Sequence, residues 1–126
     1  GDLQGWIDVI NTELMSGKGI EISVFQNVLD KSNFRIFCAL SQDETVATLL
    51  FYIHEGIAGI YLVSVKKEYR RKGIGRWLTG SAMNTLISQG IFTFVLHATP
   101  AACSLYKSLN FKEYCNFNIY WMVGKF

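Results

Sequence analysis

The sequence has little of the residues that build disulfide or metal frameworks. Its three cysteines, Cys38, Cys103 and Cys115, are odd in number and form no Cys-x-x-Cys or Cys/His pattern. Neither a disulfide framework nor a zinc site is indicated, and a reducing, cytoplasmic setting is expected. The first six residues lack the basic and apolar regions of a signal peptide, so no targeting signal is expected.

Charged residues and proline are also sparse. Charged residues make up 17% and hydrophobic residues 50% of the 126 residues, which excludes a disordered chain. Pro100 is the only proline, and no internal repeat or low-complexity segment divides the chain. The length therefore predicts a single domain over 1–126, with N-terminal helices in 1–32 and a sheet-containing core in 33–126.

One apolar stretch approaches the length of a membrane span. It runs for twenty residues from Val46 to Val65, and only His54 and Glu55 interrupt it. A His-Glu-Gly sequence between β-branched and aromatic runs is typical of a hairpin turn, and a charge at bilayer depth costs several kcal/mol. The sequence therefore favours two buried strands and no membrane partner.

Apolar spacing and turn residues predict an α/β (α+β) fold in the order α-α-β-β-β-α-β-α-β(β). The expected elements are helices over about 3–15 and 21–29, strands over 34–40, 46–53 and 57–65, a helix from 74 that stops at Gly90, a strand over 91–96, a helix over 100–109 and one or two strands over 111–123. The first three strands should form an antiparallel meander. The unit from 57 to 96 should be a right-handed parallel crossover, with 91–96 buried on both faces.

The long helix carries the clearest apolar periodicity. Its expected stripe consists of Ile74, Trp77, Leu78, Ala82, Leu86 and Ile87, whereas Thr79 is expected on the far side. Trp77 is therefore predicted to pack in the core and not to stack on nucleic acid bases.

The net charge of +2 conceals a dense basic cluster before this helix. Six of the twelve basic residues lie in eleven positions, with Glu68 the only acid among them: Lys66, Lys67, Arg70, Arg71, Lys72 and Arg76. The first N–H groups of a helix lack internal partners and lie at its positive end, so a loop entering there can hold an anion. Gly73 and Gly75 would let a phosphate approach, and the cations would add charge-assisted bonds. A tight turn, a solvated basic surface and a nucleic-acid patch are the alternatives.

Two motifs resemble the GNAT superfamily of N-acetyltransferases. Arg70-Arg71-Lys72-Gly73-Ile74-Gly75 resembles its Arg/Gln-x-x-Gly-x-Gly/Ala signature, which binds the pyrophosphate of acetyl-coenzyme A (acetyl-CoA). The family's second motif, Ala-x-x-Leu-Tyr-x-x-x-Gly-Phe, is matched by Ala102, Leu105, Tyr106, Lys107, Leu109 and Phe111, with Asn110 in place of the glycine. The resemblance covers most of the chain after residue 33. It implies a GNAT-like mixed, mostly antiparallel central sheet flanked by helices, although the family's first strand has no counterpart before Leu3.

The resemblance also implies an activity. The chain would be an acetyl-CoA-dependent N-acetyltransferase that moves an acetyl group to a primary amine of a small molecule or peptide, by direct attack in a ternary complex and without a metal. The pantetheine arm and thioester would lie against the backbone of Val63, Ser64 and Val65, and the pyrophosphate would be bound by Arg70, Arg71, Lys72, Gly73, Ile74, Gly75 and Arg76. Tyr106 would protonate the departing thiolate.

Several points stay open at this stage. The general base could be His54, Glu55, Glu68 or His97, while Cys103 is expected to be a buried thiol and not a nucleophile. The alternative function is a catalytically weak or inactive acetyl-CoA-binding module that serves a larger protein or assembly. A nucleic-acid partner is disfavoured because +2 provides no broad basic face. The acceptor is unknown, and a homodimer is left open.

Overall fold

The computed structural model describes residues 3–13 and 33–116. Its elements are α1 (Leu3–Glu13), β1 (Phe34–Ser41), β2 (Glu44–His54), β3 (Ile57–Val65), the 3-10 turn η1 (Lys67–Tyr69), α3 (Ile74–Ser88), β4 (Thr93–Leu96), the 3-10 turn η2 (Pro100–Ala102) and α4 (Cys103–Ser108). The helix predicted over 21–29 and the part of the final strands predicted over 117–123 lie outside the described residues.

The four strands form one mixed sheet in the order β1-β2-β3-β4. The pairs β1-β2 and β2-β3 are antiparallel, and β3-β4 is parallel. Gln42-Asp43 and Glu55-Gly56 make the two hairpin turns with positive φ at every position, as the twist of such hairpins favours. The predicted meander and the parallel pairing are thus confirmed. No helix in the described parts of the chain is long and apolar enough to cross a membrane.

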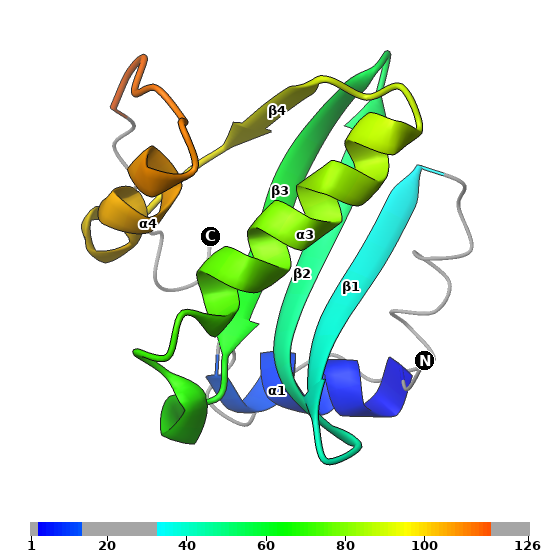
Figure 1. Ribbon diagram of the computed structural model, residues 1–126, viewed down its shortest axis with the longest axis vertical. Helices are drawn as coiled ribbons and strands as arrows, with labels where there is room; N and C mark the ends of the chain where they lie inside the picture. The colour runs from blue at the N-terminus through cyan, green and yellow to red at the C-terminus, as the bar shows by residue number, and fades with distance from the viewer. Residues whose placement is uncertain (1–2, 14–32, 117–126) are drawn as a thin grey trace, which may run out of the picture.

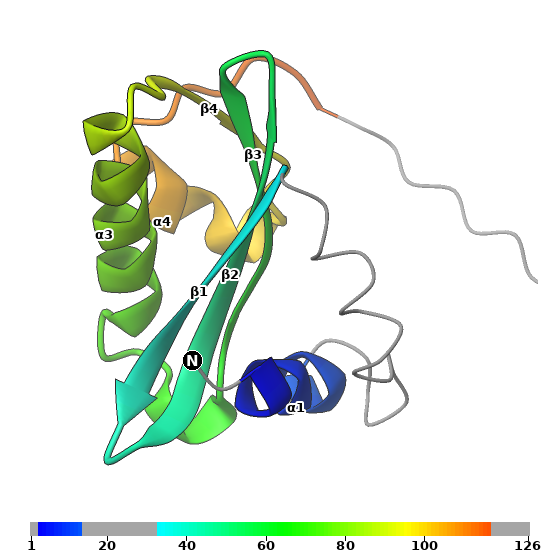
Figure 2. The same ribbon diagram turned by 90° about the vertical axis from the view of Figure 1, so that its right-hand side faces the viewer.

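Each face of the sheet has its own apolar cluster, because α1 covers one face and α3 the other (Figure 1, Figure 2). On the α3 face, Phe51 and Leu78 lie at the centre of the larger cluster. On the α1 face, the buried Trp6 packs near Leu50, and its indole N–H donates a hydrogen bond of 3.1 Å to the carbonyl of Phe37. The core therefore lies in two layers that hold the sheet from both sides.

The helix predicted from 74 is confirmed as α3, but its buried face is rotated from the expected one. Leu78, Ala82 and Leu86 are buried as predicted, whereas Trp77 is 62% exposed and Thr79 is fully buried. On a helix of 3.6 residues per turn, positions 78, 79, 82 and 86 share one side, and position 77 turns away from them. The prediction that Trp77 packs in the core is wrong.

The last part of the sheet also departs from expectation. Strand β4 begins only at Thr93, and Val95 on it is 51% exposed, so burial on both faces is wrong. The cause is that Phe94 and Leu96 pack on the α3 side, while α1 on the other face lies against β2 and β3. Residues 111–116, predicted to begin the final strands, form neither helix nor strand.

The observed orientation of α3, with Trp77 exposed and Thr79 buried, can be tested by measuring stability. Leu78→Ala should lower the free energy of unfolding by about 2–5 kcal/mol, because it opens a cavity beneath α3. Trp77→Ala should change it by no more than about 0.5 kcal/mol, because the indole is largely in water. Urea unfolding of both variants measures the difference, and a large loss with Trp77→Ala would contradict the observed orientation.

Candidate functional site

The parallel strands β3 and β4 separate part of the way along β3. They pair only from Ile57 to Ile60 on β3 and from Thr93 to Leu96 on β4. The remaining five residues of β3, 61–65, have no partner in β4, which turns away toward α4 (Figure 1). The backbone of this segment is therefore free of β4 hydrogen bonds and can bind another group.

A β-bulge lies in the same segment. Leu49 on β2 faces two residues of β3, Leu62 and Val63, and Leu62 adopts a left-handed φ of 54°. The hydroxyl of Thr48 donates a hydrogen bond of 2.9 Å to the Leu62 carbonyl, which stabilises this conformation. The extra residue places Leu62 in the α1-side cluster while Val63 stays on the α3 side. The bulge thus changes the direction of the backbone groups after it.

A turn joins this strand end to the N-terminus of α3. Its backbone is left-handed at Arg71, with φ of 63°, and at Gly73, with φ of 78°. Gly73 is the N-cap of α3, and the Trp77 N–H makes the first helical hydrogen bond to its carbonyl at 3.0 Å. The N–H groups of residues 74–76 precede that bond, so they have no acceptor within the helix and lie at its positive end. This arrangement is suited to binding an anion.

The start of α3 is packed between β3 and α4. A Cβ at Gly75 would lie 3.5 Å from Cγ2 of Val65 and 3.6 Å from Cδ1 of Leu105. One residue further, Nε of Arg76 donates a hydrogen bond of 3.1 Å to Oγ of Ser108. The structure therefore brings together three parts of the predicted site: the end of β3, the first turn of α3, and α4.

Most cations of the basic cluster have partners within the protein. Nε of Arg70 donates to the Val65 carbonyl at 3.0 Å, and its Nη2 lies 2.6 Å from a carboxylate oxygen of Glu13 in α1. Lys66 pairs with Glu44 at 2.5 Å, and this hydrogen bond raises the pKa of the lysine. Sequence reasoning missed Glu13, because no motif links it to a residue 57 positions away.

The other two cations of the signature, Lys72 and Arg71, have different surroundings. The ammonium of Lys72 lies 5.5 Å from the ring centre of Tyr69, so this side chain is directed toward η1. Arg71 is exposed and has no ion-pair partner among residues 3–13 and 33–116. Arg71 is therefore the signature residue whose guanidinium is left for a bound anion.

The second motif forms a helix end that fixes Tyr106. Asn110 adopts a left-handed φ of 70°, and its N–H bonds to the carbonyl of Lys107 while the Phe111 N–H bonds to that of Tyr106. These two bonds form a Schellman cap, whose apolar contact is the edge-on packing of the Phe111 and Tyr106 rings at 5.9 Å. Asn110 thus does what glycine does at this place in the motif, and the sequence 106–111 explains why Tyr106 is held.

Tyr106 is buried, with 8% of its surface exposed. Desolvation by this burial raises the pKa of its phenol above the ordinary value of 10.0, because the charged phenolate is disfavoured away from water. At neutral pH the hydroxyl therefore carries its proton and can donate it.

The four candidate bases lie at different places. Nε2 of His54 and Oε1 of Glu55 lie 3.8 Å apart, and both side chains are exposed at the β2-β3 turn. This is the end of β3 that is about 26 Å along the strand from the turn before α3. Glu68 lies in η1, and His97 directly follows β4 where it separates from β3. Of the four, only Glu68 and His97 thus belong to segments next to the site. Glu68 precedes the turn before α3, and His97 follows β4. Cys103 opens α4 and is half-buried.

Comparison with known protein families gives a clear match. A model described as the acetyltransferase (GNAT) domain matches residues 32–113, which include both motifs. A sequence search of curated proteins finds no match for this chain.

Solved structures share the fold. An aminoglycoside acetyltransferase from an uncultured soil metagenomic sample, in complex with trehalose, is 23% identical, with a TM-score of 0.80 and coverage of 98% of this chain and 91% of that one. The ribosomal-protein-S18-alanine N-acetyltransferase from Escherichia coli is 21% identical, with a TM-score of 0.76 and coverage of 90% and 74%. AAC(6′)-Iy in complex with a bisubstrate analogue, CoA-S-monomethyl-acetylneamine, is 12% identical, with a TM-score of 0.78 and coverage of 97% and 92%.

The raised pKa of Tyr106 predicts a pH effect on stability. The unfolded chain ionises this phenol first as the pH rises, so its stabilising contribution is full below about pH 10 and is lost as the pH rises through the folded-state pKa. Urea unfolding at about pH 8 and about pH 11 should show a smaller loss of stability in Tyr106→Phe than in the parent. Tyr114→Phe is the matched control, because Tyr114 is 89% exposed. An equal loss in the parent and Tyr106→Phe would contradict the prediction.

Proposed function

This chain is a member of the GNAT acetyltransferase family, and from that premise we propose that it is an acetyl-CoA-dependent N-acetyltransferase. The observation that carries the proposal is the meeting of three parts: the end of β3 that has no β4 partner, the glycine-containing first turn of α3, and α4 with its buried Tyr106. The acceptor amine would attack the thioester carbonyl directly. A C–N bond forms, the C–S bond breaks, and the leaving thiolate takes up a proton.

The residues of the turn suit the pyrophosphate of the co-substrate. The N–H groups of 74–76 offer backbone donors, Gly73 and Gly75 present no side chain, and Arg71 adds a charge-assisted bond. Arg70 would act differently from the other members of the signature, since its contacts with Val65 and Glu13 hold the turn in place. Lys72 and Arg76 would contribute their charge to the local potential.

The thioester oxygen and the leaving thiolate would each contact a different part of the site. The backbone N–H groups of residues 63–65, beyond the bulge, would stabilise the negative charge that develops on the thioester oxygen. The protonated phenol of Tyr106 would supply the proton for the thiolate. A base would remove a proton from the amine, and His97 and Glu68 are the candidates near the site.

The acceptor is proposed to be a primary amine of a small molecule or a peptide. Among the similar structures are an aminoglycoside acetyltransferase and a ribosomal-protein alanine N-acetyltransferase, whose names indicate a small-molecule acceptor and a protein acceptor. A panel of aminoglycosides, including sisomicin, and of peptides with free N-termini therefore tests the acceptor class. Acetylated products should be detected by mass spectrometry, because the cysteines of the protein react with thiol reagents.

Replacing one cation should show whether acetyl-CoA affinity depends on Arg71 itself or only on the net charge of the protein. Arg71→Glu should weaken acetyl-CoA binding by about tenfold or more, since it replaces a charge-assisted donor with a repelling carboxylate. Arg35→Glu makes the same charge change on β1 and should leave the affinity within about twofold. Isothermal titration calorimetry measures both. Absence of acetyl-CoA binding by the parent at high micromolar concentration would refute the proposed function.

Tyr106→Phe should separate turnover from binding. The turnover number should fall by about a hundredfold while acetyl-CoA affinity stays within about twofold, because only proton donation to the thiolate is lost. Tyr114→Phe, a change at an exposed tyrosine, should keep full activity. Binding of acetyl-CoA with no turnover on any acceptor of the panel would favour the inactive binding module over the enzyme.

A further inference from the structure

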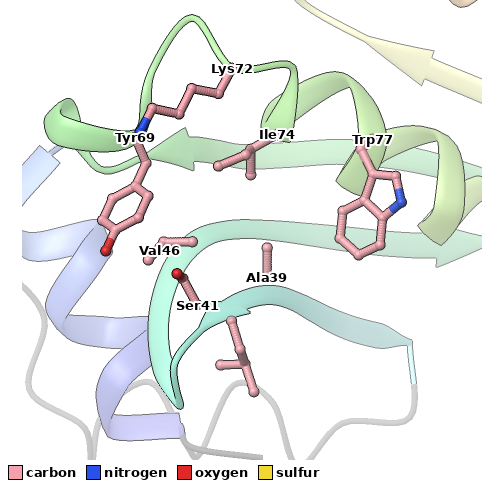
Figure 3. Close-up of a pocket in the computed structure, with 8 residues that line it drawn as sticks. Ala39, Ser41, Val46, Tyr69, Lys72, Ile74 and Trp77 are labelled. Carbon is pink, nitrogen blue, oxygen red and sulfur yellow. The ribbon is translucent and has the colours of Figure 1, made fainter.

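A pocket lies on the α3 face of the sheet, beside β1 and β2, whereas the candidate site is formed by the end of β3, the start of α3 and α4. Its volume is about 340 Å³, within the range of small-molecule sites. The lining comes from η1, α3 and the two strands, and consists of Ala39, Leu40, Ser41, Val46, Tyr69, Lys72, Ile74 and Trp77. Tyr69 and Trp77 are directed toward the strands on either side of Ile74 (Figure 3).

One apolar lining residue is left in water. Trp77 is 62% exposed, although α3 is otherwise packed on the core. Covering an exposed indole releases water from apolar surface and is favourable. The pocket therefore offers an apolar wall to a ligand without rearrangement of the core.

The charge of the pocket has one sign. Lys72 is the only ionisable lining residue with a charge at neutral pH, and its ammonium lies over the Tyr69 ring. On the β1-β2 hairpin, Glu44 is paired with Lys66 at 2.5 Å. A carboxylate in the pocket would thus meet an ammonium, whereas a cation would meet repulsion.

We propose that this pocket is a binding site for a small aromatic carboxylate, with its ring against Trp77 and Ile74 and its carboxylate at the ammonium of Lys72. The flat apolar ring matches the exposed indole, and the single negative charge matches the single cation. The pocket differs from the proposed acetyl-CoA site, which comprises the end of β3, the backbone N–H groups at the start of α3, and α4, although Lys72 and Ile74 belong to both. The proposal does not depend on the enzyme activity, because binding itself is measured.

Three ligands of nearly equal shape provide the test: 2-naphthoate, 2-naphthylmethanol and 2-naphthylmethylamine. Each is titrated into the full chain labelled with ¹⁵N, and the indole N–H signals are followed by NMR. The signal of Trp77 should shift with 2-naphthoate, while that of the buried Trp6 should stay in place. 2-Naphthoate should bind about threefold or more tighter than the alcohol, and tighter again than the amine.

Matched variants locate the binding. Trp77→Ala should weaken 2-naphthoate binding by about tenfold, measured on the remaining backbone signals. Phe92→Ala is the control, because Phe92 is 74% exposed but does not line the pocket, and it should leave the affinity unchanged. Lys72→Met should remove the preference for the acid over the alcohol. Thermal unfolding of each variant checks that the fold is retained.

Four results would overturn the proposal. They are an unshifted Trp77 signal at millimolar 2-naphthoate, equal affinity for the acid and the alcohol in the parent, equal weakening by Trp77→Ala and Phe92→Ala, and displacement of 2-naphthoate by coenzyme A. Displacement would mean that the pocket belongs to the acetyl-CoA site. Failure of acetyl-CoA to bind at all would refute the proposed function. It would not change the shift of the Trp77 signal that 2-naphthoate is expected to cause.

Discussion

The separation of β3 from β4 after four paired residues is the constraint on which the candidate site depends. Strands that stayed paired would use the backbone groups of 61–65 in the sheet, and no donor would remain for a substrate carbonyl. The bulge at Leu62 acts in the same segment, because it turns the backbone beyond it and is secured by the Thr48 hydroxyl. Paired strands thus supply the rigid frame, and the part of β3 that β4 leaves unpaired would supply the binding groups.

Contacts from distant parts of the sequence hold the elements around this end. Arg70 joins the turn to β3 through the Val65 carbonyl and to α1 through Glu13. On the other side, Gly75 allows α3 to approach Val65 and Leu105, and Arg76 reaches Ser108 in α4. A turn with left-handed residues carries conformational strain, so it needs such support to keep its backbone donors in one arrangement.

Local sequence patterns predicted most of the fold and both motifs. The hairpin at Glu55-Gly56, helix α3 and the left-handed Asn110 follow from turn residues, apolar periodicity and the conformational freedom of asparagine, all of which act over a few neighbouring positions. The failures concern tertiary packing. Periodicity alone could not tell which side of α3 faces the sheet, so the expected positions of Trp77 and Thr79 were the reverse of those observed. Nor could it tell that Val95 on β4 stays 51% exposed while Phe94 and Leu96 pack on the α3 side.

The basic cluster shows the same limit in the candidate site itself. As a sequence, six cations in eleven residues indicate a region of high positive charge. In the structure, Lys66 pairs with Glu44 and Arg70 with Glu13, so these two charges stabilise the fold around the turn, and the Lys72 ammonium is directed toward the Tyr69 ring. At the start of α3, the groups that would face an anion are the first backbone N–H groups of the helix and the Arg71 side chain. The proposed anion recognition would thus depend more on the backbone conformation of residues 71–75 than on the amount of positive charge, so a net charge of only +2 is compatible with it.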